Sequence, residues 1–318
     1  MERWRDWLSA HVSRKPAPTA EAGSVPRLDP KPRVVLFDIY GTLLAARHGD
    51  LEAQVRNRPA EESFVETARF FGFSEEDGLA WAEGFFRAVK EEHERCRAMG
   101  IGRAEVLVER IWEELLRSVP DPPPTLPDPL DAALYRELKA NPVSPYEGAA
   151  EALAALHREG YLLGVASNAQ FYTVPILEYA LGGEGRLFPG AEPLGPAEGE
   201  GETAALTWEK PLSEGASETA PEALFHPDWI FFSFHLGFAK PDPHFFRLVA
   251  TRARRCGWNP EEVLVVGNDP VNDMEAARLH GIQAVLFSPA PTATPLGASW
   301  SGPSVHRFDA LVQALIGR

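Results

Sequence analysis

Five short runs of continuously apolar residues are the strongest constraint on how this 318-residue chain can fold. The first, Val34-Val35-Leu36-Phe37, stops abruptly at Asp38. An apolar run without alternation is typical of a strand that is buried on both faces of a parallel sheet. We therefore predict strands at this run and at four more, residues 162–166, 229–232, 263–266 and 284–287.

Helical patterns alternate with these runs. Gly160 and Gly281 stand where helices would end just before a strand begins. Alternating helices and buried strands predict an α/β fold with a parallel sheet core and helices on both faces. In such sheets the ligand site lies outside the carboxyl ends of the strands. The residues directly after each run are therefore the first candidates for function.

A long helical insertion separates the first two predicted strands. The residues Ser74-Glu75-Glu76-Asp77 form a capping-box pattern at the start of one of its helices. The Pro-rich stretch at 120–129 predicts an extended connection that interrupts the helical insertion. We expect a helical cap domain at 50–145, and an α/β core formed by residues 33–49 and 146–318.

Two further segments differ from the core. Residues 1–32 predict a short N-terminal helix, followed by a linker rich in Pro and Ala. Residues 183–226 are rich in Glu, Gly, Ala and Pro and poor in large apolar side chains. This composition predicts a flexible acidic insertion within the core, with Trp208 and Phe225 as its anchors.

The overall composition limits the classes of partner. A formal net charge of −15 argues against nucleic acid, because binding to its phosphate backbone needs a basic surface. No run approaches the roughly 20 apolar residues of a membrane span, and the N-terminus lacks a signal-peptide pattern. Cys96 and Cys256 lie far apart without metal-type spacing. We expect a cytoplasmic protein that acts on a small anionic molecule, and the sequence indicates no oligomeric state.

Polar clusters follow the predicted strands in an ordered series. They are Asp38 to Leu43, Ser167 with Asn168, Gly237 to Pro243 around Lys240, and Gly267 to Asp273. A carboxylate can act as a nucleophile, and lysine with hydroxyl or amide donors can neutralise a transferring phosphoryl group. Paired carboxylates supply the oxygen ligands that Mg²⁺ prefers. Each cluster alone is typical of a turn or a helix cap, but the ordered series favours a catalytic site.

The four clusters resemble the motifs of the haloacid dehalogenase superfamily. The matching residues are DIYGTL at 38–43, SN at 167–168, KPDP at 240–243 and GNDPVND at 267–273. The helical insertion after the first motif is similar to the cap of that family. The resemblance extends over residues 33–290, apart from the insertion at 183–226. It implies a Rossmann-like sheet and a hydrolase that works through an aspartyl intermediate.

The resemblance also implies roles for individual residues. Asp38 would be the nucleophile and would bind Mg²⁺ together with the Tyr40 backbone carbonyl and Asp269. Ser167 would hydrogen-bond the phosphate, and Lys240 would hold both the nucleophile and the phosphate.

Three further residues complete the predicted catalytic set. Asp273 would orient Lys240 or a water bound to the metal. Thr42 supplies a hydroxyl in the turn after Asp38. Asn168 matches a residue that the 2-haloacid dehalogenases of this superfamily place near the halide.

Tyr40 departs from the pattern of the phosphatases in this superfamily, which carry an aspartate there as general acid and base. A tyrosine hydroxyl, with a pKa of about 10, is a poor substitute at neutral pH. Tyr40 and Asn168 favour a metal-independent 2-haloacid dehalogenase, which would need an arginine for the substrate carboxylate. Four arginines are candidates for that role: Arg47, Arg56, Arg58 and Arg110.

Asp269 and Asp273 favour the opposite interpretation, a Mg²⁺-dependent phosphatase acting on a small phosphorylated metabolite. The phosphatase is the preferred hypothesis, with the dehalogenase as its alternative. A third hypothesis is a catalytically impaired binding protein that keeps the fold.

Overall fold

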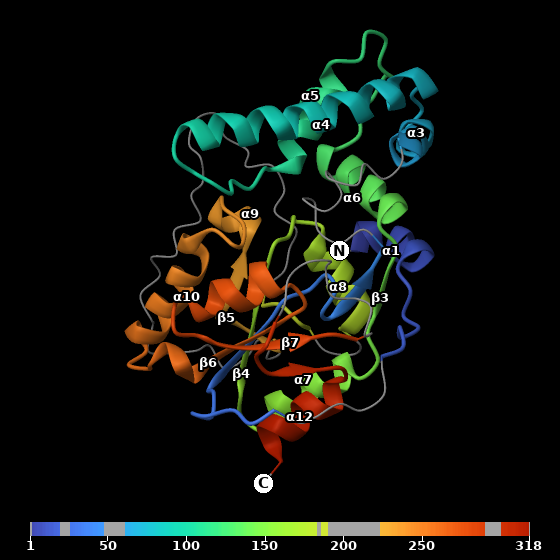
Figure 1. The fold of residues 1–318 in the computed structure, drawn as a ribbon. Helices are drawn as coiled ribbons and strands as arrows, with labels where there is room; N and C mark the ends of the chain where they lie inside the picture. Colours follow the sequence, from blue (N-terminus) through green and yellow to red (C-terminus); the bar gives the residue numbers. More distant parts are fainter. Residues whose placement is uncertain are drawn as a thin grey trace.

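The computed structural model describes residues 2–19, 26–47, 61–182, 186–189, 223–289 and 300–317. A six-stranded sheet with the order β5-β4-β1-β6-β7-β8 forms its centre (Figure 1). The strands are β1 (Val34–Phe37), β4 (Leu162–Ser167), β5 (Phe225–Phe232), β6 (Val263–Gly267), β7 (Gln283–Phe287) and β8 (Ser304–Val305). All neighbouring strands pair in parallel, which confirms the predicted sheet. The sequence did not predict β8, which is only two residues long.

Strand β1 separates two hydrophobic cores. Val34 and Leu36 face a core that includes side chains from α10 (Pro243–Arg255) and the short α11 (Ala276–Arg278). Val35 and Phe37 face the other core, which is covered by three helices. These are α7 (Ala149–Arg158), α8 (Thr173–Leu181) and α12 (Phe308–Ile316). Burial of both faces of β1 explains why its sequence is apolar without alternation.

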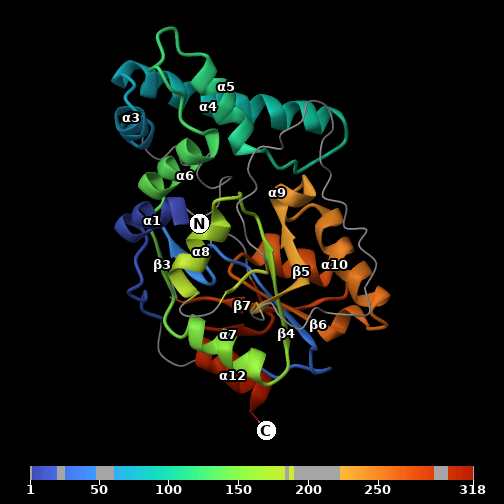
Figure 2. The same ribbon diagram turned by 180° about the vertical axis from the view of Figure 1, so that it is seen from behind.

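Four helices lie beyond one end of the sheet, where Figures 1 and 2 show them as a separate layer. They are α3 (Glu61–Phe70), α4 (Glu75–Ala98), α5 (Val108–Arg117) and α6 (Pro129–Ala140). Ser74 caps α4 through a complete capping box with Asp77, as the sequence predicted. Phe64 stacks on Trp112 in their shared core. The boundaries of the cap at 50 and 145 stay a prediction, and residues 48–60 lie outside the described part of the chain.

The remaining elements are short. Two of them are strands, β2 (Leu44–Ala46) and β3 (Val143–Pro145), which pair antiparallel at the two crossings between core and cap. The others are η1 (Glu2–Trp4), α1 (Arg5–His11), α9 (Ser233–Leu236), η2 (Pro260–Glu262) and η3 (Pro270–Glu275).

The N-terminal segment holds the cap against the core. Trp4 is fully buried, and its Nε1 donates a hydrogen bond of 2.7 Å to Asp131 of α6. Further along the segment, the Ala17 amide donates to the Pro145 carbonyl at 2.7 Å. The backbone at the beginning of the predicted linker therefore extends along β3 and is bound to it. Residues 20–25 lie outside the described residues.

The predicted acidic insertion is described only at its ends. Most of it, with Trp208, lies outside the described residues. Leu187 and Phe188 are buried, and Phe225 is the first residue of β5 and is fully buried. The sequence suggested Phe225 as an anchor but gave no sign of Leu187 and Phe188.

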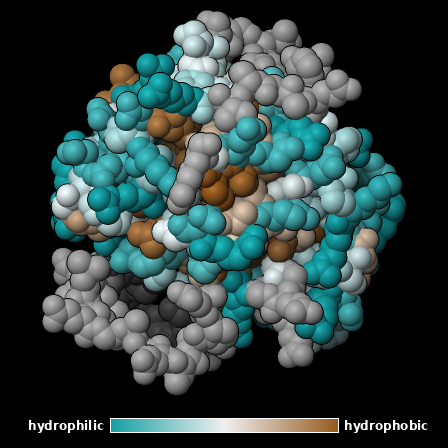
Figure 3. Space-filling model, turned by 90° about the horizontal axis from the view of Figure 1, so that it is seen from below, coloured by the Kyte–Doolittle hydropathy of each residue, from teal (hydrophilic) through white to brown (hydrophobic). Residues whose placement is uncertain are grey.

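The surface seen from the end opposite the cap helices is mostly hydrophilic, with hydrophobic side chains gathered near its middle (Figure 3). Among the described residues, no helix combines the length and the apolar composition that crossing a membrane requires.

Replacement of Trp4 tests how much the N-terminal segment stabilises the fold. We expect Trp4→Ala to lower the free energy of unfolding by about 3–5 kcal/mol, since a fully buried aromatic side chain and its hydrogen bond are both lost. Urea denaturation measures this loss. Arg5→Ala, at an exposed position on the same segment, is the control and should change the stability by less than about 0.5 kcal/mol. Equal effects of the two substitutions would contradict the assigned role.

Candidate active site

Four segments meet around the carboxyl end of β1. The chain runs from β1 outward through β4 to β5, then returns to β6 on the other side of β1. This reversal is a topological switch point, where open α/β sheets bind their ligands. Asp38 directly follows β1, Ser167 ends β4, and Asp269 lies two residues beyond β6.

The Asp38 carboxylate is almost completely buried and accepts several hydrogen bonds. Its Oδ1 accepts from the Ser167 hydroxyl at 3.0 Å and from the Lys240 amine at 2.9 Å. Within the described part of the chain, its Oδ2 accepts a single bond, from the Thr42 hydroxyl at 3.3 Å. A carboxylate oxygen has two lone-pair sites, so Oδ2 keeps one for a metal ion or an electrophile.

Lys240 lies between two buried carboxylates. Its Nζ donates to Asp38 Oδ1, to Asp273 Oδ1, and to the Ala166 carbonyl at 2.8 Å. Burial disfavours the charge on Lys240, but Asp273 and Asp38 outweigh it and raise the pKa of the lysine above its ordinary value. Burial, reinforced by the negative charge of Asp38, raises the pKa of Asp273 to about 7 despite the adjacent lysine. Because its own pKa is raised, Lys240 is cationic at neutral pH.

Asn168 fixes the backbone of Lys240. Its Oδ1 accepts from the Lys240 amide at 2.7 Å, and its Nδ2 donates to the Lys240 carbonyl at 3.0 Å. These two bonds join the loop after β4 to the loop after β5. The two bonds to Lys240 give Asn168 a role in positioning this loop. Beyond these described bonds its side chain keeps one N–H. A place near a halide stays a prediction.

Two glycines allow the segments to approach each other. Gly41 has a φ of +89°, and a Cβ there would lie 2.2 Å from the Asn268 side chain. At Gly267 a Cβ would lie 2.3 Å from Asp273 Oδ2. Any larger residue at either position would displace the side chains that surround Asp38.

The carboxylate of Asp269 is chemically suited to bind a metal ion. Its Oδ1 accepts from the amides of Val271 and Asn272, whereas Oδ2 accepts a single bond, from the Asn272 side chain at 3.1 Å. Oδ2 therefore keeps a lone pair, as Asp38 Oδ2 does. Within the described ranges no three His, Cys, Asp or Glu side chains gather at a metal-type site. An ion here would depend on two carboxylates, the Tyr40 carbonyl and water, an oxygen set that fits Mg²⁺.

The side chain of Tyr40 belongs to the hydrophobic core. It is 7% exposed, and its hydroxyl hydrogen-bonds the Thr173 hydroxyl at the start of α8 at 3.0 Å. The sequence did not indicate this contact, since Thr173 carries no motif.

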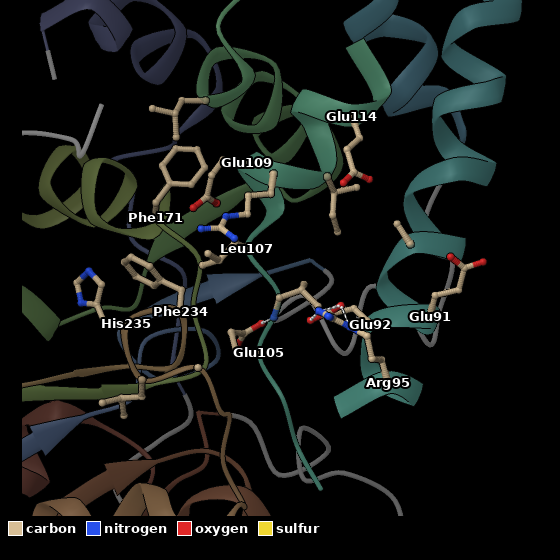
Figure 4. A pocket seen from close by; sticks show the side chains of 17 residues that line it. Glu91, Glu92, Arg95, Glu105, Leu107, Glu109, Glu114, Phe171, Phe234 and His235 are labelled. Atoms are coloured by element: carbon tan, nitrogen blue, oxygen red, sulfur yellow. Dashed lines mark hydrogen bonds and ion pairs between the residues drawn. The ribbon is translucent and has the colours of Figure 1, made fainter. Parts of the chain in front are cut away.

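A cleft lies between the cap helices and the core beside this site. Its volume is about 830 Å³. Figure 4 shows Phe171 and His235 on its core side, Glu92 and Arg95 on α4, and Glu105 between them. Burial lowers the pKa of His235 to about 4, so its imidazole is neutral at neutral pH. Asp38, Ser167, Lys240 and Asp269 are not among the residues that line this cleft.

The arginines suggested for a haloacid carboxylate lie in different places. Arg47 is exposed, and Arg110 lines the cleft. Arg56 and Arg58 lie outside the described residues. The sequence also missed Gln170, a buried glutamine two residues after Asn168 that contacts the cap. A single glutamine in a loop forms no pattern by which it could be found.

The fold and the polar centre at the switch point define an α/β protein with a parallel sheet, a helical insertion after its first strand and a carboxylate cluster at the carboxyl end of that strand. The chain belongs to the haloacid dehalogenase-like hydrolases: the model of this family matches residues 32–195, and a HAD-hydrolase-like model matches residues 237–292. The predicted resemblance is thereby confirmed.

Several individual proteins are similar to the chain. A phosphoserine phosphatase from Thermus thermophilus is 34% identical over 106 residues, which are 31% of this chain and 39% of that protein. A HAD phosphatase from Thermococcus onnurineus has 16% identity and a TM-score of 0.47, over 90% of this chain and 98% of its own. The L-2-haloacid dehalogenase from Xanthobacter autotrophicus has 16% identity and a TM-score of 0.44, over 90% and 99%.

Removal of the lysine charge tests the buried cluster without reference to any substrate. We expect Lys240→Met to lower the free energy of unfolding at neutral pH by about 3–5 kcal/mol, because Asp38 and Asp273 would stay buried without their cation. Lys90→Met is the control. Its amine is exposed and lies 3.8 Å from Glu94, so we expect a change below about 0.5 kcal/mol in urea denaturation. A Lys240 variant as stable as the control would show that the cluster holds no such charge.

Proposed function

We propose that this protein is a phosphatase that hydrolyses a small phosphate monoester through an aspartyl-phosphate on Asp38. The observation that carries the proposal is the bonding of Asp38 Oδ1 to Lys240 and Ser167, which leaves Oδ2 with an unused lone pair. The similarity to a phosphoserine phosphatase, over 39% of that protein's length, supports phosphate esters as the substrate class.

In the first step, the Asp38 carboxylate attacks the phosphorus through one oxygen, in line with the ester oxygen, and its other oxygen would hold the metal ion. A P–O bond to the carboxylate forms as the P–O bond to the leaving group breaks, and the leaving group departs as an oxyanion that takes up a proton from water. Water then attacks the aspartyl-phosphate, releases inorganic phosphate and restores the carboxylate. Lys240 and the Ser167 hydroxyl lie at the nucleophile, where they neutralise charge on the transferring oxygens.

Asp38, Asp269 and the Tyr40 carbonyl would hold Mg²⁺ in this proposal. The bound ion would offset the repulsion between the carboxylate nucleophile and the anionic phosphate. Asp273 contributes from the other side of the site. Its carboxylate holds Lys240, and it accepts from the Asp269 amide at 3.0 Å, so one side chain orients both the cation and the turn of the metal ligand.

The leaving group receives no carboxylic acid proton from position 40. The Tyr40 hydroxyl hydrogen-bonds Thr173 and is a weak acid at neutral pH. We therefore propose that the enzyme favours esters whose alcohol leaves readily as an anion. Alkyl phosphates, whose alkoxide needs a proton, would react slowly.

A 2-haloacid dehalogenase remains the second candidate, favoured by Tyr40 because halide leaves carbon without a proton. It would use the same Asp38 carboxylate, with C–halogen cleavage in place of P–O cleavage. The third hypothesis, an impaired binding protein, requires that neither reaction occurs. Phosphate and halide release therefore separate the three.

Replacement of the nucleophile and removal of divalent cations test the main proposal. We expect Asp38→Asn to reduce phosphate release more than about 1000-fold, since the amide cannot form the covalent intermediate. EDTA should abolish release, and added Mg²⁺ should restore it. Asp121→Asn, at an exposed carboxylate, is the control and should keep full activity.

Three results would contradict the proposal. Phosphate release that is unchanged in EDTA would show that Asp269 does not act as a metal ligand in the reaction. Halide release from 2-chloropropionate in EDTA would favour the dehalogenase. No release of either product across broad panels would favour the binding protein.

Restoration of an acid at position 40 tests the leaving-group argument. We expect Tyr40→Asp to raise kcat for glycerol phosphate by at least about tenfold, because general acid catalysis contributes factors of 10²–10⁴. The kcat for p-nitrophenyl phosphate should change much less, since nitrophenolate departs without a proton. Tyr40→Asn is the matched control: it loses the same packing and the same bond to Thr173 but supplies no acid. An equal change in kcat for both esters would contradict the leaving-group argument.

A further inference from the structure

Residues 103–108, here called the strap, form the last part of the connection from α4 to α5 and include the first residue of α5. The strap contacts the loop that carries Lys240. The Glu105 amide donates to the Gly237 carbonyl at 3.0 Å, and the Ala239 amide donates to the Arg103 carbonyl at 2.8 Å. These two bonds form a short antiparallel pairing of the strap with residues 237–239. Lys240 is the next residue, so its backbone position depends on this pairing.

Gln170 ties the same strap to the loop that follows Ser167. Its Nε2 donates to Glu105 Oε1 at 2.8 Å and to the Val106 carbonyl at 2.9 Å. Its Oε1 accepts a longer bond, 3.4 Å, from the Val108 amide at the start of α5. The side chain is 2% exposed, so water cannot replace these bonds without a rearrangement.

The strap is anchored in the hydrophobic core by Val106 and Val108, and part of it also borders a cleft. Glu105, Val106 and Leu107 line the 830 Å³ cleft, which lies between them and the cap helices (Figure 4). Gln170 and the two backbone bonds therefore contribute to the attachment of the strap, together with the burial of Val106 and Val108.

The two loops that the strap contacts are also joined to each other. Asn168 bonds both the amide and the carbonyl of Lys240. Hydrogen bonds and short stretches of chain thus connect the strap, Gln170, Asn168 and the Lys240 loop in a closed circuit, and Lys240 links this circuit to Asp38. A misplacement of about 1 Å of a catalytic group can reduce turnover about 100-fold, so the circuit can control activity.

We propose that Gln170 is a positioning residue that couples docking of the cap strap to the alignment of Ser167 and Lys240 at Asp38. With the strap docked, both loops hold the positions that the Asp38 bonds require. With the strap released, the Lys240 loop loses its pairing with residues 103–105. The effect on turnover rests on the proposed function, whereas the docking itself does not.

Gln170→Leu removes all three side-chain bonds and keeps a similar volume. We expect kcat for p-nitrophenyl phosphate to fall at least tenfold while KM changes less than threefold, since the change affects alignment and leaves the ester contacts in place. Hydrogen exchange of the Glu105 and Ala239 amides, measured without substrate, should accelerate at least tenfold. Amides of β1 and β6 should keep their exchange rates.

Gln283→Leu is the matched control. Gln283 also donates two side-chain bonds, to the carbonyls of Pro30 and Glu261, but it lies at the amino end of β7, away from Asp38. Its loss should lower stability and leave both kcat and the exchange of the strap unchanged.

The outcomes separate the coupling from the function. Unchanged exchange of the strap in Gln170→Leu would overturn the proposal, as would faster exchange with an unchanged kcat. Faster exchange throughout the chain would also overturn it, because that result shows a general structural role. Local acceleration in a protein whose wild type hydrolyses no phosphate ester would support strap docking by Gln170 and overturn the proposed function.

Discussion

The buried amine of Lys240 is the interaction on which the candidate site depends. It holds two carboxylates, Asp38 and Asp273, that come from different strand ends and would otherwise repel each other in a medium that solvates charge poorly. One cation cannot neutralise both, so the cluster retains a net negative charge. That residual charge is consistent with the raised pKa of Asp273. If the site accepts a phosphate as proposed, this charge gives a physical reason for a divalent cation at Asp269.

The arrangement of the strands makes this cluster possible. Since β1 lies between β4 and β6, the residues that follow these three strands share one edge, and the return of the chain from β5 brings Lys240 there. The apolar runs predicted this edge from sequence, because full burial on both faces leaves a readable signature. The order of the polar clusters then predicted which side chains would meet. Their meeting is observed, and their catalytic roles stay predictions.

Other parts of the molecule could not be predicted, for a common physical reason. Gln170, Thr173 and Leu187 act through contacts with residues distant in sequence, and no local period or spacing marks them. The contacts of the N-terminal segment could not be predicted for the same reason. Its helical pattern was visible, but the bond from Trp4 to Asp131 depends on a helix more than 120 residues away. Sequence patterns report burial and local geometry, whereas the attachment of the cap depends on contacts between residues far apart in the chain.

Tyr40 and Asp269 together indicate which step of the proposed reaction is limited. The nucleophile, its cation and both acidic residues after β6 are present, so the attacking side of the proposed first step has its polar groups. What position 40 lacks is an acid for the departing alcohol. Such a site distinguishes esters by the basicity of their leaving groups even where the cap imposes little selection by shape. In the proposed coupling, the attachment of the strap next to Lys240 would add a second control, because alignment of the site would depend on docking of the strap. Selection would thus combine chemical reactivity at position 40 with geometry at Gln170, two constraints that act on different bonds of the same site.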